Sequence, residues 1–245
     1  MERVIPMWRK IKKALLIVLV VLAVVGTGFG IYVGNYYHAD LEAIQDLSIG
    51  VEYEKMERLE DGSLVFFPAQ YDRAVIFYPG GKVEALAYIP LMEHCAQEGV
   101  LAVLMPMPFN LAVLAKDAAE LIPEQFPQVQ HWYMAGHSLG GSMAASFAAD
   151  HDWVEGLILL AAYSTEDVSH IPVLSIYGSA DGVLNMEKYE QYRPNLPADL
   201  TESVIEGGNH AGFGLYGIQK GDGETAISNA EQIARTAQEI AAFVK

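Results

Sequence analysis

The chain has 245 residues, of which 52% are hydrophobic and 19% are charged, and its formal net charge at pH 7 is −16. This length allows one sizeable hydrophobic core and is short for two. Such an acidic chain repels nucleic acid and anionic lipid surfaces, which excludes functions that depend on binding phosphates by charge. A single cysteine, Cys95, excludes an intramolecular disulfide.

The first predicted element is an apolar helix over residues 14–33, a stretch of twenty residues without a charge. At about 1.5 Å per residue, such a helix spans roughly 30 Å, the thickness of the hydrocarbon core of a bilayer. Residues 1–13 carry five Lys or Arg against one Glu, and basic flanks of this kind stay in the cytoplasm. We therefore predict an uncleaved single-pass anchor in the cell membrane, with a cytoplasmic N-terminus and the remainder outside.

A cleaved signal peptide, which would leave a secreted protein, is the alternative. Residues 14–25 have the length of its hydrophobic region, and the residues at 26–28 are small. Against it, no A-x-A cleavage pattern follows and apolar character resumes at Phe29. We expect residues 34–50 to link the anchor to one domain over residues 51–245.

In that domain, short strand-like runs alternate with helical patterns. Strands are predicted at residues 51–60, 63–69, 74–79, 100–106, 131–136, 154–162, 171–178 and 203–206. The first two flank an Asp-Gly turn. Most of the later runs are continuously apolar, which is typical of parallel strands that are buried on both faces.

The helical patterns lie between these runs, at residues 88–97, 111–122, 139–151 and 227–244. Alternating strands and helices predict an α/β fold, with a mostly parallel central sheet flanked by helices and joined by right-handed crossovers. Only residues 164–170 separate two of the later strands. That is too short for an inserted cap domain and leaves little room for a crossover helix.

Ser138 lies in the string AGHSLGGS (residues 135–142). It directly follows a predicted strand and precedes a predicted helix, which is the setting of a nucleophile elbow. Small residues flank the serine in such an elbow because the turn is tight and its backbone is strained. The turn presents the hydroxyl at the C-terminal edge of the sheet and leaves the Leu139 N–H at a helix N-terminus. We therefore predict that Ser138 is a nucleophile rather than part of a plain glycine-rich turn.

A nucleophilic serine needs a histidine base, and the base needs a carboxylate that orients it. After an elbow serine, the acid and then the histidine follow along the chain, each just beyond a strand. Asp181 and His210 occupy these places. Open α/β sheets bind their ligands at these strand ends. We predict that Asp181 orients His210, with Glu206 and Asp222 as alternative acids.

Two other reactive side chains receive structural roles. His137 directly precedes Ser138, but in a tight elbow its side chain points away, so we assign it to packing or hydrogen bonding. Cys95 lies in an apolar helical pattern and is predicted to be a core residue. The His, Cys and carboxylate residues show no metal-ligand spacing. Neither a metal nor another cofactor is predicted.

An oxyanion hole needs a second donor beside the Leu139 N–H. In enzymes with a nucleophile elbow, the loop after the third strand supplies this donor. In this chain that loop contains Gly80 and Gly81, which permit a close approach of the backbone to a substrate oxygen. We predict the Gly81 N–H as this donor, with Lys82 as the alternative.

Four blocks make the chain resemble the α/β-hydrolase superfamily, and within it the small, membrane-anchored bacterial serine hydrolases related to dienelactone hydrolase and carboxylesterases. The blocks are FYPGGKVEALAYIPL (77–91), AGHSLGGSMAA (135–145), VLSIYGSADGVL (173–184) and IEGGNHAGFGLYG (205–217). The resemblance implies that Ser138 is the nucleophile, that His210 is the general base and then acid, and that Asp181 orients His210. It also implies an oxyanion hole formed by the Leu139 and Gly81 N–H groups.

The chain departs from these relatives in two places. Its loop after the third strand has Pro-Gly-Gly in place of the common His-Gly, which leaves the second oxyanion donor open. Dienelactone hydrolases have a cysteine nucleophile where this chain has Ser138, so their particular substrate is not implied.

The sequence thus predicts a carboxylesterase-like serine hydrolase (EC 3.1) that cleaves a small-molecule ester through an acyl-enzyme. A thioesterase, peptidase or acyltransferase on the same three residues is the alternative, as is a non-catalytic extracellular interaction module on a hydrolase scaffold. The expected partners are the substrate and the membrane, and nucleic acid is not among them. No oligomeric state is predicted.

Overall fold

The computed structural model describes residues 7–245. Contacts divide the chain into two compact units, Met1–Tyr36 and Tyr37–Lys245. The described part of the first unit consists almost entirely of one helix, α1 (Met7–Gly34). Residues 1–6 of the predicted basic N-terminus lie outside the described residues.

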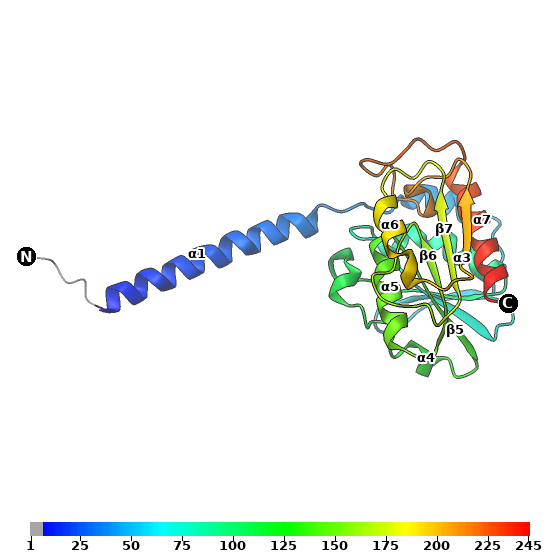
Figure 1. Cartoon of the computed structure of the whole chain (residues 1–245), viewed down its shortest axis with the longest axis horizontal. Coiled ribbons are helices and arrows are strands. Elements are labelled where there is room, and N and C mark those ends of the chain that lie inside the picture. Colours follow the sequence, from blue (N-terminus) through cyan, green and yellow to red (C-terminus); the bar gives the residue numbers. More distant parts are fainter. Residues whose placement is uncertain (1–6) are drawn as a thin grey trace, which may run out of the picture. The chain divides into compact units, whose positions relative to one another are not determined.

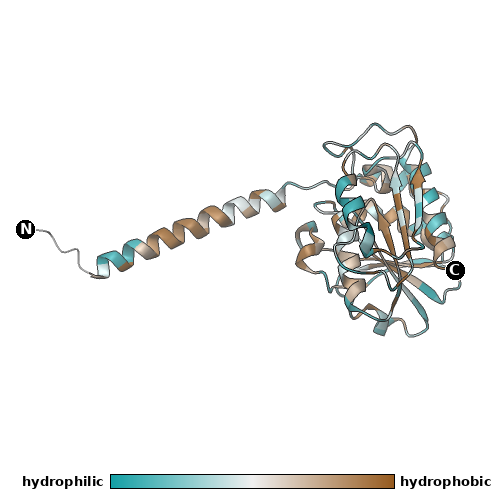
Figure 2. Cartoon of the chain, viewed as in Figure 1, coloured by the Kyte–Doolittle hydropathy of each residue, from teal (hydrophilic) through white to brown (hydrophobic). Residues whose placement is uncertain are grey.

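Helix α1 contains the predicted apolar helix and extends it toward the N-terminus. Its middle is hydrophobic, whereas its first turns are hydrophilic (Figure 2). None of its residues is buried. It is long and apolar enough to cross a membrane, a property that a membrane anchor and a signal sequence share.

The second unit contains one eight-stranded sheet (Figure 1). Its strands are β1 (Lys55–Arg58), β2 (Leu64–Phe67), β3 (Arg73–Tyr78), β4 (Leu101–Leu104), β5 (His131–His137), β6 (Val154–Leu160), β7 (Val173–Gly178) and β8 (Thr201–Ile205). They lie in the order β1-β2-β4-β3-β5-β6-β7-β8. From β4 to β8 all neighbours are parallel, and β2 is antiparallel to both β1 and β4. The predicted, mostly parallel sheet is confirmed.

Helices cover both faces of the sheet. The remaining α-helices are α2 (Leu41–Ser48), α3 (Ile89–Gln97), α4 (Ile122–Gln125), α5 (Leu139–Asp150), α6 (Met186–Tyr192) and α7 (Asn229–Phe243). Short 3-10 turns are η1 (Ala85–Tyr88), η2 (Pro108–Asn110), η3 (Ala112–Leu114), η4 (Arg193–Asn195) and η5 (Ala211–Phe213). Helix α2 lies within residues 34–50 and buries Ile44.

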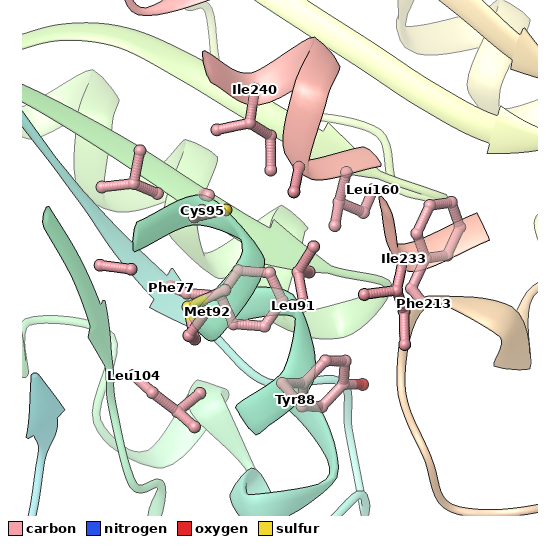
Figure 3. Close-up of a cluster of buried hydrophobic side chains, with 14 of the residues drawn as sticks. Phe77, Tyr88, Leu91, Met92, Cys95, Leu104, Leu160, Phe213, Ile233 and Ile240 are labelled. Carbon is pink, nitrogen blue, oxygen red and sulfur yellow. The ribbon is translucent and has the colours of Figure 1, made fainter. Parts of the chain in front are cut away.

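Two hydrophobic layers result from the alternation of side chains along the strands. Phe77 of β3 points to one face and packs with α3 and α7, as Figure 3 shows. Its neighbour Ile76 points to the other face, where Phe147 of α5 lies in the same cluster. Both faces are covered, which explains why the parallel strands have continuously apolar sequences.

The helix predicted over residues 111–122 is wrong. The segment forms η3 and a series of turns before α4 begins at Ile122. A buried side chain takes the backbone groups that a helix would pair, because the Tyr78 hydroxyl donates to the Lys116 carbonyl and accepts from the Ala119 N–H. Competition of this kind from a tertiary contact is not visible in the helical spacing of the apolar residues.

The C-terminal ends of the parallel strands meet at one edge of the sheet. The register pairs Tyr78 with Gly136, His137 with Leu160, and Gly178 with Ile205. The chain leaves β3 for β4 on one side and later enters β5 on the other, so the sheet has its topological switch point between β3 and β5. Ligands bind at such points in open α/β sheets. Between β6 and β7, residues 161–172 form turns and bends with no helix.

Candidate functional site

Ser138 occupies the sharp turn between β5 and α5. Its backbone has φ 52° and ψ −122°, and a positive φ is unfavourable for a serine. The Ser138 N–H donates to the Leu160 carbonyl at 2.9 Å, which ties the turn to the end of β6. The strand–turn–helix setting that the sequence predicts around Ser138 is therefore present.

Close packing requires the glycines on either side of Ser138. A β-carbon on Gly140 would lie 2.2 Å from the carbonyl oxygens of Tyr78 and Pro79. A β-carbon on Gly136 would lie 2.5 Å from the carbonyl carbon of Gly140. Real side chains do not approach backbone atoms so closely. The two glycines thus let α5 begin directly against the ends of β3 and β5.

Asp181 and His210 form a buried hydrogen-bonded pair. Asp181 follows β7 and His210 follows β8, and their side chains are 2% and 1% exposed. The His210 Nδ1 lies 2.9 Å from Asp181 Oδ2. The other carboxylate oxygen accepts the N–H groups of Val183 and Leu184, each at 2.8 Å. These contacts hold the carboxylate in position for its hydrogen bond to the imidazole.

This pairing determines the tautomer of His210. An ionised carboxylate only accepts hydrogen bonds, so Nδ1 of the neutral ring must carry the proton. Nε2 then has the lone pair. That atom is buried and has no hydrogen-bond partner among the described residues. It is available to accept a proton.

Asp222 binds the backbone around this pair. Its Oδ1 accepts the N–H groups of His210 at 3.1 Å and Gly182 at 3.2 Å. Its Oδ2 accepts the Ala211 N–H at 2.8 Å, and its own neighbour Gly223 donates to Oδ1 at 2.9 Å. Asp222 therefore links the loop of Asp181 to the loop of His210. Neither alternative acid binds the His210 ring. Asp222 contacts the His210 backbone, and the ring binds Asp181. Glu206 is exposed after β8.

The loop after β3 lies against the start of α5. A β-carbon on Gly81 would be 2.8 Å from the Leu139 Cδ2. The neighbouring Lys82 has a φ of 62°, and its N–H donates to the Asn110 carbonyl at 2.7 Å. That amide is already used within the protein, which favours Gly81 over Lys82 as a donor to a ligand.

Ser138 and His210 open into the same cleft, which has a volume of about 230 Å³. Its lining residues are Ser138, Leu139, Ser142, Ala161, Ala162, Tyr163, Val183, Leu184, Asn185 and His210. No Asp, Glu, Lys or Arg belongs to this described lining. Asp181 lies behind His210 and does not line the cleft.

Sequence reasoning missed part of the lining of the cleft and the partner of His137. Tyr163 and Asn185 line this part of the cleft and carry no motif. His137 is buried, and its Nδ1 lies 2.8 Å from the hydroxyl of Tyr88. Only the three-dimensional fold brings Tyr88 to the elbow, so the sequence holds no local signal for this contact. Within residues 7–245, no group of three or more His, Cys, Asp or Glu residues could hold a metal ion.

Solved structures of low sequence identity share this fold. A hyperthermophilic esterase from the archaeon Pyrobaculum calidifontis is 16% identical, with a TM-score of 0.59 over 83% of this chain and 92% of that chain. An esterase domain from Rhodothermus marinus is 12% identical, with a TM-score of 0.56 over 77% and 95%. A predicted CIB-like hydrolase from Thermoplasma acidophilum is 18% identical, with a TM-score of 0.52 over 77% and 98%.

The sequence itself gives the family. No curated protein matches the chain. The model of the alpha/beta hydrolase family matches residues 74–234, which is more than half of the chain and runs from the second residue of β3 past β8, with the loops of the candidate site. This assignment supports a hydrolase. The chain belongs to the alpha/beta hydrolase family.

Proposed function

We propose that this protein is a carboxylesterase-like serine hydrolase that cleaves esters at Ser138. One observation carries the proposal. The buried Asp181–His210 pair leaves the His210 Nε2 without a hydrogen-bond partner, and His210 lines the same cleft as Ser138, which lies in a strained turn. A nucleophile, a base and a group that orients the base are the parts that acyl transfer needs.

In the acylation step, His210 Nε2 takes the proton of the Ser138 hydroxyl as its oxygen attacks the ester carbonyl carbon. The tetrahedral intermediate collapses, the bond to the alcohol oxygen breaks, and His210 gives its proton to that oxygen. Water then enters, His210 removes one of its protons, and the resulting hydroxide attacks the acyl carbon. The acid leaves and Ser138 regains its proton from His210.

Asp181 orients His210 and stabilises its protonated form in both steps. Its hydrogen bond to Nδ1 holds the ring and leaves Nε2 to take the proton, and its negative charge stabilises the imidazolium that forms. Val183 and Leu184 donate to the same carboxylate, so it does not have to reorganise as charge develops on His210.

Two backbone amides would stabilise the oxyanion. Leu139 opens α5, where the first N–H groups of a helix have no partner within it and carry partial positive charge. Gly81 lies against Leu139 and is the second donor that we propose. Losing one donor of an oxyanion hole costs about 10²- to 10³-fold in kcat.

The cleft favours a small, uncharged acyl group. Its volume of about 230 Å³ is below the roughly 300–1,000 Å³ of pockets that hold drug-sized ligands. The lining offers alanine, leucine and valine side chains but no cation to bind a substrate carboxylate. We expect short-chain esters to be preferred over long-chain or anionic ones.

We further propose that residues 14–33 anchor the enzyme in the cell membrane, with residues 1–13 in the cytoplasm. Residues 34–50 join this anchor to the catalytic domain, residues 51–245, outside the cell. The basic cluster before the apolar helix supports this orientation. Protease added to intact cells should remove the domain from full-length protein. Protection of the domain in intact cells, with digestion only after lysis, would contradict the orientation.

The activity is tested with purified full-length protein in detergent and a panel of p-nitrophenyl acetate, butyrate and octanoate, a thioester and an anilide. We expect turnover of the two shorter esters, lost in Ser138→Ala. Ser142 lines the same cleft, so Ser142→Ala is the matched control and should retain ester turnover. Preference for the thioester or the anilide would reassign the reaction. An inactive wild type, or ester turnover that survives Ser138→Ala, would contradict the proposal.

A further inference from the structure

A buried pair outside the Ser138–His210–Asp181 set joins the nucleophile elbow to the loop after β3. Tyr88 is the last residue of η1 and His137 is the last residue of β5, and both side chains are fully buried. The ring of Tyr88 packs at the edge of the apolar cluster in Figure 3. Its hydroxyl lies 2.8 Å from His137 Nδ1 and accepts the Gly80 N–H at 3.2 Å.

The contact between this pair and Gly80 is close. A β-carbon on Gly80 would lie 2.8 Å from both His137 Nδ1 and the Tyr88 hydroxyl oxygen. The backbone of the loop therefore rests directly on the two side chains. Gly81, the proposed oxyanion donor, is the next residue along the chain.

The hydrogen-bond directions follow from counting protons. If His137 Nδ1 carried a proton, the Tyr88 oxygen would accept from both Nδ1 and Gly80, and its own proton would have no acceptor. Fewer groups are left unpaired when Gly80 N–H donates to Tyr88 and Tyr88 O–H donates to His137 Nδ1. The neutral His137 then carries its proton on Nε2, which is buried and has no hydrogen-bond partner among the described residues.

His137 is well suited to remain neutral beside a base that becomes charged. Burial and then the charge of His210 lower the pKa of His137 well below its ordinary value, and the His210 backbone opposes this in part. The two imidazole rings have centroids 4.5 Å apart. A neutral His137 can keep accepting from Tyr88 while His210 is protonated during the reaction.

We propose that Tyr88 and His137 are positioning residues that hold the two halves of the oxyanion hole at a fixed separation. His137 adjoins Ser138, which leads into Leu139, and Gly80 adjoins Gly81. The Tyr88 hydroxyl joins the Gly80 backbone to the His137 side chain through two hydrogen bonds. This role rests on the serine hydrolase function proposed above.

The test uses full-length Tyr88→Phe, which keeps the ring and removes only the hydroxyl. Loss of an oxyanion donor costs about 10²- to 10³-fold, and a loosened donor should cost less, so we expect kcat to fall about tenfold with KM within about twofold. Affinity for a trifluoromethyl ketone, which reacts with the serine to form a tetrahedral adduct, should fall in parallel with kcat/KM. Amide exchange in the peptide that contains Gly80 and Gly81 should accelerate.

Two further variants separate positioning from general stability. His137→Leu removes the acceptor and should match Tyr88→Phe, whereas His137→Asn returns an acceptor oxygen and should recover part of kcat. The double variant Tyr88→Phe/His137→Leu should be no slower than the worse single variant, because both act through one contact.

The matched control is Tyr189→Phe. Tyr189 is also buried, and its hydroxyl bonds Ser175 and Glu202 on β7 and β8, away from the elbow. It should lose stability without the loss in kcat. Wild-type kcat and trifluoromethyl ketone affinity in Tyr88→Phe would overturn this inference alone. A wild type inert to both ester and fluorophosphonate would overturn the proposed function and this inference with it.

Discussion

Asp222 accepts a hydrogen bond from the backbone N–H of His210 at 3.1 Å, while the ring of His210 binds a different carboxylate, that of Asp181. The same Asp222 also accepts from Gly182, beside Asp181. One carboxylate therefore fixes the two loops, and the other fixes the ring. This division of roles predicts that replacing Asp222 and replacing Asp181 have different effects on stability and kcat.

Replacing Asp222 with Ala should lower both stability and kcat. Four backbone N–H groups lose their acceptor, and each partly buried donor left unpaired costs about 1–3 kcal/mol unless water reaches it. We expect urea unfolding to show a loss of about 1–3 kcal/mol, with a fall in kcat as the Asp181–His210 geometry loosens. Asp181→Asn should instead lower kcat much more than stability, because it leaves the loops joined.

Asp167→Ala is the control for Asp222, since Asp167 accepts hydrogen bonds from its near neighbour Ser169 in an exposed loop. The substitution should change neither the free energy of unfolding nor kcat appreciably. An Asp222→Ala protein with wild-type stability and kcat would show that the link between the loops is dispensable.

Gly140→Ala should destabilise the fold rather than change the chemistry alone. The new β-carbon would meet two backbone carbonyls, which cannot move as a flexible side chain can. Overpacking of this kind costs about 1–3 kcal/mol or more. Thermal unfolding of the Gly140→Ala protein measures this loss of stability. Ser142→Ala, two residues later in α5, loses one hydrogen bond to the Tyr163 carbonyl and should cost about 0.5–1.5 kcal/mol. Equal effects of the two substitutions would argue against close packing at Gly140.

His137 makes folding stability depend on pH in a defined direction. Its pKa is lowered well below 6.5 in the folded protein, chiefly by burial and then by His210. Below about pH 6.5 the unfolded chain therefore binds a proton that the folded protein does not, so stability falls as pH decreases, at up to about 1.4 kcal/mol per pH unit. Above that pH the contribution is constant.

Urea unfolding at pH 7.5 and 5.5 should show this loss, and His137→Asn should reduce it. His170, which is exposed, provides the control variant His170→Asn, whose pH dependence should match the wild type. The same pH dependence in His137→Asn as in the wild type would contradict the assignment to His137.

Cys95 should be inert in the native protein. Burial raises the pKa of its thiol to about 12, so almost no nucleophilic thiolate exists at neutral pH. A thiol reagent such as Ellman's reagent should react only after unfolding. Cys95→Ala should leave kcat unchanged, as expected for a serine enzyme. Fast native labelling, or loss of kcat in a folded Cys95→Ala protein, would point to a thiol mechanism.

Patterns that depend on neighbours in the chain were predictable from the sequence. The continuously apolar strands indicated a parallel sheet, and the setting of Ser138 indicated a strand–turn–helix elbow. The places of Asp181 and His210 after strands brought them to the same edge of the sheet, where the structure pairs them.

Contacts between distant segments were not predictable in the same way. The Tyr78 hydroxyl binds backbone groups of residues 116 and 119, in place of the helical bonds that the apolar spacing indicates. The sequence offers Asp222 as an alternative partner of the His210 ring, whereas in the structure it binds the His210 backbone. Tyr88 reaches His137 from 49 residues away. In each case a polar side chain satisfies groups that only the folded arrangement brings within reach.

The central claim, that Ser138 is an activated nucleophile, is tested most directly by labelling the full-length protein with a fluorophosphonate and mapping the modified peptide by mass spectrometry. We predict a single adduct on Ser138, absent from Ser138→Ala, slowed in His210→Ala and retained in Ser142→Ala. A folded wild-type protein in which Ser138 stays unmodified, or carries no more label than Ser142, would contradict the claim.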